Sequence, residues 1–389
     1  MLTRRDCAHN PDEALATKRR SLLAGQMRLS IVLPRVSSEP VGGYLVQYEL
    51  ADWLAAKGHS PTIVHSASID ANRWTSLGLY GLAWLNASGR PRKLVPWHRF
   101  HPHVRVRFIP WLTPAFLPRA DVTVLTAFQT AMAITRQTAR TGPLAQIVYD
   151  YELWAGGDAE SRKEIEAALS RSDVAHIATS GAVTRMLDDM GVAVVETVRP
   201  GVALDFTCRT LPSERQRTIG FSYRTGPHKG MAELLSSLEQ VHDLYADVTI
   251  KCFGVGAVGL PPWVKTLGYL TNAELSAFYN ECSIFVLPSR YEGWGLPAAE
   301  AMACGAAVVT TDCGGPADFA EHERTALVVR PGDTEALAHA IMRLLEDDNL
   351  RYRLASASVK QLSTMTWAQT ATSLEAVLVR LVNAERIGT

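Results

Sequence analysis

The sequence contains little of what a metal centre, a disulfide framework or a membrane anchor requires. Its six cysteines are scattered over 389 residues, with no Cys-x-x-Cys pair and no histidine at zinc spacing, which disfavours both a zinc site and a disulfide scaffold. No apolar run approaches the roughly 20 residues that a membrane helix needs. We therefore expect reduced cysteines and a cytoplasmic protein.

An excess of one charge is absent as well. Lysine and arginine together number 39, and so do aspartate and glutamate. No net field would therefore draw the chain to nucleic acid, and no nucleic-acid partner is expected. The hydrophobic content of 47% is normal for a globular protein. A chain of this length exceeds one ordinary core, which predicts two domains.

The N-terminal residues lack the apolar core of a signal peptide, although they carry several basic side chains. The segment Met27–Leu33 then reads as a first strand. We expect a disordered leader over 1–26, an N-terminal domain over 27–205 and a C-terminal domain over 206–366. The remaining residues, 367–389, form a final helix whose placement the sequence does not fix.

Short apolar strands alternate with helical patterns along most of the chain. In the first half the expected strands are 29–33, 62–65, 104–109, 122–125, 146–149 and 174–179, with helices at 44–57 and 159–171. In the second half they are 217–222, 248–253, 284–287 and 307–310, with helices at 231–245, at 274–281 and from 296. This alternation predicts an α/β fold with parallel sheets covered on both faces. Two such halves predict a ligand crevice between the domains, at the carboxyl ends of the strands.

One loop between an expected strand and an expected helix carries two glycines and is flanked by two acids. Gly293 and Gly295 let backbone approach a ligand closely. Unpaired N–H groups and the positive end of the helix dipole would then face that ligand, as a diphosphate requires. Glu292 and Glu300, separated by seven residues, suit the hydroxyls of a sugar or ribose. The alternative is an ordinary strand, loop and helix whose acids cap the helix.

A second loop, Ser222–Gly230, carries Arg224 and Lys229 between a strand and a helix. An arginine forks onto two phosphate oxygens and a lysine adds a compact charge. Two such cations could stabilise a departing diphosphate without a metal. The alternative is a pair of solvated cations at a helix start, although the helix dipole disfavours them there unless an anion offsets it.

The stretch from residue 73 to 119 contains no acidic residue, while basic residues alternate with tryptophans. Such a segment can lie on an anionic bilayer or grip an anionic acceptor. The alternative is a solvated basic loop around a core strand, with its tryptophans packed inward.

Taken together, Arg224, Lys229, Glu292 and Glu300 resemble the active-site signature of glycosyltransferase family 4, the retaining nucleotide-sugar transferases of GT-B fold. The resemblance implies two Rossmann-like domains whose parallel sheets face each other across a cleft, with an N-terminal acceptor domain and a C-terminal donor domain. It also implies that Arg224 and Lys229 bind the donor diphosphate, that Glu300 holds the ribose and that Glu292 lies beside the donor sugar.

The resemblance extends to other segments. The pair Gly42-Gly43 looks like the family's N-terminal glycine loop, and Tyr269-Leu270 resembles the segment whose backbone reads the base. The donor-binding residues that the resemblance implies are Gly42, Gly43, Tyr269, Leu270, Gly293, Trp294, Gly295, Leu296 and Glu300.

The chain also departs from the family pattern. Many relatives have glycine where this chain has Tyr223, and many place a histidine near the donor sugar where this chain has Asp150. The segments around Thr126 and Asp150 resemble a bacterial subgroup that includes deoxysugar, rhamnosyl-type transferases. This likeness implies that Asp150 and Thr126 contact the acceptor or the donor sugar. The alternative for Asp150 is a structural acid that caps its loop.

The implied activity is retaining transfer of a hexosyl or deoxyhexosyl group from a UDP-, GDP- or dTDP-linked sugar to a glycan, a lipid-linked or a small-molecule acceptor. We expect no cofactor and no metal, because nothing resembles the Asp-x-Asp metal motif. Peripheral contact with the inner membrane face is compatible with residues 73–119. The alternatives are an epimerase or phosphorylase of the same fold, or a catalytically silent nucleotide-sugar-binding protein. A Rossmann dehydrogenase is disfavoured, because no Gly-x-Gly-x-x-Gly follows Leu33.

Overall fold

The computed structural model of the protein describes residues 25–68, 77–81, 89–149 and 159–388. The chain divides into two compact units. The first comprises Met1–Gln146, Ser172–Ala175 and Glu375–Thr389, and the second comprises Ile147–Arg171 and His176–Leu374. The predicted boundary between residues 205 and 206 lies inside the second unit, and the predicted domain division stays a prediction.

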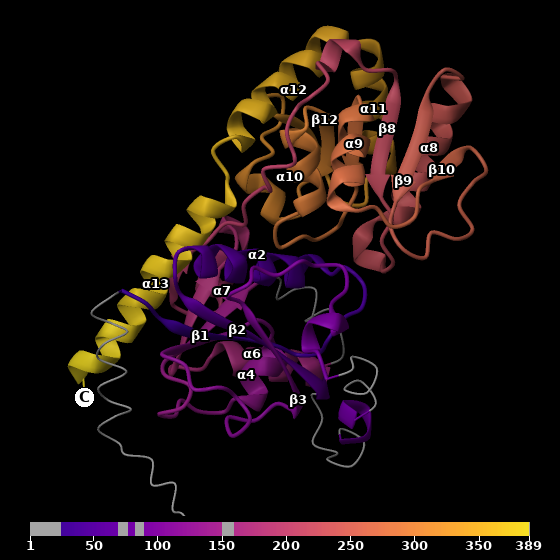
Figure 1. The fold of residues 1–389 in the computed structure, drawn as a ribbon. Helices are drawn as coiled ribbons and strands as arrows, with labels where there is room; N and C mark the ends of the chain where they lie inside the picture. The colour runs from indigo at the N-terminus through magenta and orange to yellow at the C-terminus, as the bar shows by residue number, and fades with distance from the viewer. Residues whose placement is uncertain (1–24, 69–76, 82–88, 150–158, 389) are drawn as a thin grey trace, which may run out of the picture. The chain divides into compact units, whose positions relative to one another are not determined.

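A seven-stranded sheet is built from the first half of the chain (Figure 1). Its strands lie in the order β3-β2-β1-β4-β5-β6-β7, and every pair with a printed register is parallel. The strands are β1 (Arg28–Leu33), β2 (Ser60–Ser68), β3 (Arg105–Trp111), β4 (Val122–Leu125), β5 (Leu144–Val148), β6 (Val174–Ala178) and β7 (Val194–Thr197). The helices along this half are α2 (Gly42–Ala56), η1 (Pro91–Leu94), α4 (Phe128–Ala133), α6 (Ala159–Leu169) and α7 (Gly181–Asp189).

A six-stranded sheet is built from the second half, in the order β10-β9-β8-β11-β12-β13, and it is parallel throughout. Its strands are β8 (Thr218–Ser222), β9 (Thr249–Phe253), β10 (Val264–Thr266), β11 (Ile284–Leu287), β12 (Ala307–Thr311) and β13 (Ala326–Val329). The longer helices are α8 (Met231–Leu244), α9 (Asn272–Glu281), α10 (Leu296–Ala303), α11 (Thr334–Glu346), α12 (Asp348–Leu362) and α13 (Trp367–Gly388). Short 3-10 turns are η2 (Pro212–Glu214), η3 (Pro227–Lys229) and η4 (Gly315–Asp318).

The central strand β11 shows why this sheet needs helices on both faces. All four of its residues are buried. Ile284 and Val286 belong to one hydrophobic cluster, shared with α8, α11 and α12, whereas Phe285 and Leu287 belong to another, shared with α9 and α10. Because side chains alternate along a strand, the two clusters cover opposite faces. The predicted α/β class with doubly covered parallel sheets is confirmed.

The order of the strands marks a switch point in this sheet. After β8 the chain builds β9 and β10 on one side, and it then returns to build β11 on the other side of β8. In open parallel sheets the loops at such a point diverge and leave room for a ligand at the carboxyl ends of the strands. The loops after β8 and β11 therefore border the expected ligand position.

The first helix of the described chain begins earlier than predicted. The helix α2 begins at Gly42 rather than near residue 44, so Gly42 and Gly43 occupy its first turn and do not form a loop before it. Glycine can adopt helical angles like other residues, although it costs roughly 0.5–1 kcal/mol relative to alanine inside a helix.

None of the helices in the described ranges is both long and apolar enough to cross a membrane.

Candidate active site at the ends of β8 and β11

The loops that follow β8 and β11 are fastened to each other. The two strands are parallel neighbours, so both loops leave the same edge of the sheet. The Arg290 N–H donates to the His228 carbonyl at 2.7 Å. Gly230 has a positive φ of 64°, and a Cβ there would lie 2.1 Å from the Pro288 carbonyl oxygen. Glycine is therefore required where the two loops approach most closely.

Lys229 and Glu292 form an ion pair across these two loops. The Lys229 Nζ donates to Glu292 Oε1 at 2.8 Å, and the Ser289 hydroxyl donates to the same oxygen at 2.7 Å. The two charged side chains are only 20% and 16% exposed. A close pair near a protein surface interacts by about 4 kcal/mol, against about 1 kcal/mol in bulk water, so partial burial favours the paired arrangement. The lysine keeps further N–H donors for a ligand.

The backbone of Glu292 is held from the other side by the segment after β12. Its N–H donates to the Cys313 carbonyl, and its carbonyl accepts from the Gly315 N–H, each at 2.7 Å. A Cβ on Gly315 would lie 2.3 Å from the Gly293 carbonyl oxygen. The position of the carboxylate is therefore fixed by backbone bonds as well as by its side-chain partners.

Helix α10 begins directly after this loop, with Gly295 as its N-cap at φ 94°. No side chain caps the helix, and its first turn contains no acid. The alternative that Glu292 and Glu300 serve as caps is therefore wrong. The positive end of the dipole is not offset by an acid in that turn, which leaves it suited to an anion. The Trp294 ring is 4% exposed and packs 5.2 Å from the Phe319 ring, which anchors the turn.

Glu300 is the buried acid of the site. It is 7% exposed, and the Tyr279 hydroxyl donates to its Oε2 at 2.9 Å. Burial raises the pKa of Glu300 to about 7, while the Tyr279 hydrogen bond and the charge of Arg224 lower it. Arg224 itself is exposed. Its effect on this pKa shows that it lies within electrostatic reach of Glu300.

The other predicted residues are distributed as follows. Tyr269 is 49% exposed, and Leu270 packs against the cluster around Phe285. Gly42 and Gly43 belong to α2 in the first unit. The Thr126 hydroxyl, also in the first unit, donates to the Val32 carbonyl at 2.8 Å. Asp150 lies outside the described residues.

Two residues that hold the acids were missed by the sequence reading. Tyr279 holds Glu300, and no local pattern signals this because the two residues are 21 positions apart and on different helices. Ser289 holds Glu292 through its hydroxyl, three residues earlier in the same loop, and no sequence pattern used above singles out this pair.

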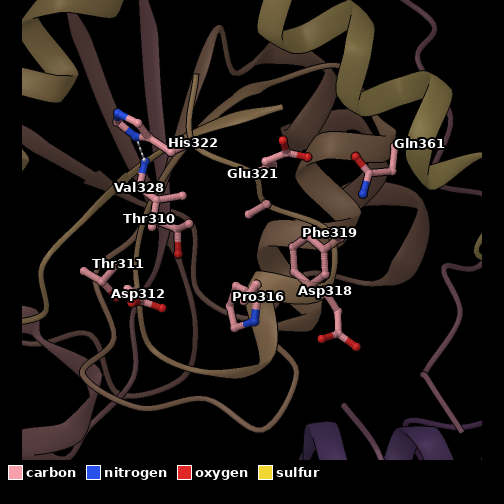
Figure 2. A pocket seen from close by; sticks show the side chains of 12 residues that line it. Thr310, Thr311, Asp312, Pro316, Asp318, Phe319, Glu321, His322, Val328 and Gln361 are labelled. Carbon is pink, nitrogen blue, oxygen red and sulfur yellow. Dashed lines mark hydrogen bonds between the residues drawn. The ribbon is translucent and has the colours of Figure 1, made fainter. Parts of the chain in front are cut away.

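A pocket of about 440 Å³ lies beside this site but is distinct from it (Figure 2). It is lined by residues 310–312, 316–322, 328 and 361, and it includes none of Lys229, Glu292 and Glu300. Asp318, one of its acids, accepts from the Gly181 N–H at 3.1 Å and from Arg199 Nε at 2.5 Å. Its lining contains none of the residues predicted to bind the donor.

The described ranges contain no group of three His, Cys, Asp or Glu residues that could hold a metal ion. Metal independence and the absence of a cofactor remain predictions.

The part of the chain that carries these residues is similar to known proteins. Residues 209–361 match the family model described as "Glycosyl transferases group 1". Over 106 residues the chain is 36% identical to O-antigen chain mannosyltransferase B of Escherichia coli, a match that covers 27% of each protein.

Two solved structures share the fold over nearly the whole chain. Sucrose-phosphate synthase from Thermosynechococcus elongatus has a TM-score of 0.73 at 18% identity, covering 92% of this chain and 99% of the other. HepE from Anabaena, solved in complex with UDP-glucose, has a TM-score of 0.69 at 17% identity, covering 91% and 99%.

The fold is that of the GT-B glycosyltransferases. The segment 209–361, which matches the group 1 glycosyl transferase model, contains Arg224, Lys229, Glu292 and Glu300. This match agrees with the resemblance predicted from these four residues, and the rhamnosyl-type subgroup stays a prediction.

Proposed function

We propose that the protein transfers a sugar from a nucleotide-diphosphate donor to an acceptor hydroxyl, with retention of the anomeric configuration and without a metal. One observation carries the proposal: the Lys229–Glu292 pair, with Arg224 and Glu300 nearby, lies within the segment that matches the group 1 glycosyl transferase model. The complex of HepE with UDP-glucose supports a nucleotide sugar as the donor.

The donor diphosphate would lie against Arg224, Lys229 and the start of α10. When the bond between the anomeric carbon and the phosphate oxygen breaks, its electron pair leaves with the diphosphate, whose negative charge grows. Fixed cations stabilise that charge most at this moment, which accelerates the reaction rather than merely tightening binding. The acceptor oxygen bonds to the anomeric carbon on the same face, and its proton passes to the departing phosphate oxygen.

The two acids would have different roles because their surroundings differ. Glu292 is paired with Lys229 and Ser289, so it would lie beside the donor sugar and position the lysine. Glu300 is buried with only one of its oxygens bonded to Tyr279. Its other oxygen would accept a hydrogen bond from a ribose hydroxyl.

The substrate is proposed only by class. The donor sugar is a hexose or deoxyhexose linked to UDP, GDP or dTDP, and the acceptor is a glycan, a lipid-linked or a small molecule in glycan biosynthesis.

The decisive experiment removes the lysine. Lys229→Ala is expected to lower kcat by at least about a hundredfold, because it deletes one of two charges that stabilise the leaving group. The measurement is transfer of labelled sugar from a panel of donors. Lys251→Ala is the matched control, because its ammonium pairs with exposed Glu281 at 2.7 Å. A near-normal kcat for Lys229→Ala would overturn the mechanism.

The same assay separates the alternatives. Conversion of the donor sugar without any acceptor would indicate an epimerase, and sugar transfer to inorganic phosphate would indicate a phosphorylase. Donor binding with neither hydrolysis nor transfer would indicate a catalytically silent binding protein. The anomeric configuration of the product, measured by NMR, tests retention directly.

A further inference from the structure

The edge of the seven-stranded sheet formed by β3 concentrates exposed positive charge. β3 is the outermost strand on its side of the sheet. Between residues 89 and 119, a range that the structure describes without a gap, seven lysine and arginine side chains are exposed and there is no acid. These cations are Arg90, Arg92, Lys93, Arg99, Arg105, Arg107 and Arg119.

Contacts within the first unit hold the turn that carries Arg90, Arg92 and Lys93 next to β3. The Arg92 guanidinium donates to the His101 and Pro102 carbonyls at 3.1 Å and also to the Val104 carbonyl. The turn η1 is thereby fixed next to the residues that lead into β3. On the strand, Arg105 and Arg107 are two residues apart and both exposed, so they project from one face.

Exposed apolar side chains lie in the same place. The Tyr80 ring stacks on Phe108 of β3 at 5.3 Å, which holds residues 77–81 against the strand. The Phe116 ring meets Trp111 edge-on at 5.0 Å, at the end of β3. The side chains left open to solvent there are Leu77, Leu79 and Phe116, which are 43%, 48% and 37% exposed. We call the cations from Arg90 to Arg107 and these three apolar residues the basic edge.

No ion pair neutralises the basic edge among the residues that the structure describes. Asp52 contacts the segment leading to β3, but its partners are His98 and His101 rather than these cations. One of its oxygens pairs with His98 Nε2 at 2.9 Å and the other accepts from the His101 N–H at 2.8 Å. The cations of the basic edge therefore produce a local positive field on a chain whose formal net charge is zero.

We propose that the basic edge binds the surface of an anionic lipid bilayer. The cations match phosphate headgroups, which attract each lysine or arginine near the surface. The exposed leucines and phenylalanine favour a bilayer over a soluble polyanion, because they gain by entering the boundary between headgroups and acyl chains. The proposal concerns the first unit alone and does not depend on the proposed function.

The test is flotation of the full chain with vesicles. Phosphatidylglycerol–phosphatidylcholine vesicles are expected to carry the protein, and pure phosphatidylcholine vesicles are not. Binding should weaken as salt rises, because salt screens exposed charges. Each cation contributes a factor of about five to partition, so Arg105→Glu with Arg107→Glu should weaken it at least about 30-fold.

Two further double variants serve as controls for this test. Lys265→Glu with Lys360→Glu makes the same change in net charge at exposed positions of the second unit and should leave vesicle binding unchanged. Lys93→Glu with Arg99→Glu repeats the reversal outside β3, which serves if the strand variant fails to fold. The proposal is overturned if the wild-type chain does not float with anionic vesicles, or if the control lowers binding as much as the edge variants. Binding to soluble polyphosphate but not to vesicles would also overturn it.

Discussion

At the scale of single residues, the hydrogen bond from Tyr279 to Glu300 has a direct consequence for pH. Both side chains are buried, and burial holds the pKa of Glu300 at about 7 even though the tyrosine lowers it. A ribose hydroxyl bonds better to an ionised carboxylate than to a neutral acid. Donor affinity should therefore improve as pH rises through this pKa.

Tyr279→Phe is expected to move that transition to higher pH. The change deletes only the hydroxyl that donates to Glu300 Oε2, so the neutral acid is favoured and its pKa rises. The measurement is the donor KM between pH 5.5 and 9 (roughly the range that brackets the pKa). The midpoint should shift upward while kcat at high pH changes little.

Tyr245→Phe provides the matched control, because it removes a hydroxyl that donates to Glu346 on the exposed surface. His228 does not obscure the result. Burial and the neighbouring Lys229 lower its pKa below the ordinary value, so it titrates at lower pH than Glu300. An unshifted midpoint in Tyr279→Phe would show that Glu300 does not govern donor binding.

The residues of the site could be predicted where they belong to a short, recognisable sequence motif. Arg224, Lys229, Glu292 and Glu300 stand in short motifs, and the structure brings Lys229 to Glu292 as well as Arg224 within reach of Glu300. Their roles in binding and catalysis stay predictions. The direct ion pair was not predicted, because a motif shows which residues share a loop but not which of them touch.

At the scale of elements, the site depends on loops that approach each other at glycines. Gly315 lies against Gly293, and its N–H donates to the Glu292 carbonyl. This contact ties the loop after β12 to the loop after β11, two neighbouring strands. The arrangement leaves no room for a side chain.

Gly315→Ala should therefore weaken donor binding. The added methyl would lie 2.3 Å from the Gly293 carbonyl oxygen, so the loop that carries Glu292 must move, at a cost of typically 1–3 kcal/mol. We expect a donor KM raised about tenfold and a lower melting temperature. Gly81→Ala is the control, because a Cβ there meets nothing within 4 Å. Equal behaviour of the two variants would contradict this reading.

The predicted bounds agree best with the observed ones for strands whose residues are all buried. The strand 284–287 was predicted with its observed bounds because every residue is apolar and buried. The strand β10 was not predicted, because Val264–Thr266 contains one buried residue and owes its form to pairing with β9. Helices α11 and α12 were also not predicted, although Asp333 and Asp347 accept from the backbone as N-caps and supply the expected signal.

At the scale of the whole molecule, binding of a nucleoside diphosphate should stabilise the fold. A ligand at a hundred times its Kd adds about 2.7 kcal/mol to the free energy of unfolding. Uridine, guanosine and thymidine diphosphates, compared by thermal shift, should reveal the preferred base. Glu300→Ala should reduce the shift for the preferred diphosphate, because it removes the proposed ribose contact. Equal, negligible shifts with all three would argue against a nucleotide-sugar donor.

The predicted cleft between facing sheets stays a prediction.

The parallel bridge between Glu292 and Gly314 limits how this loop can change. It adds one rung to the ladder beyond the end of the strands, and the acid stands on that rung. Inserting or deleting a single residue between Ser289 and Glu292 should remove Glu292 from it and separate its carboxylate from the Lys229 ammonium. The length of this turn is therefore constrained as well as its side chains.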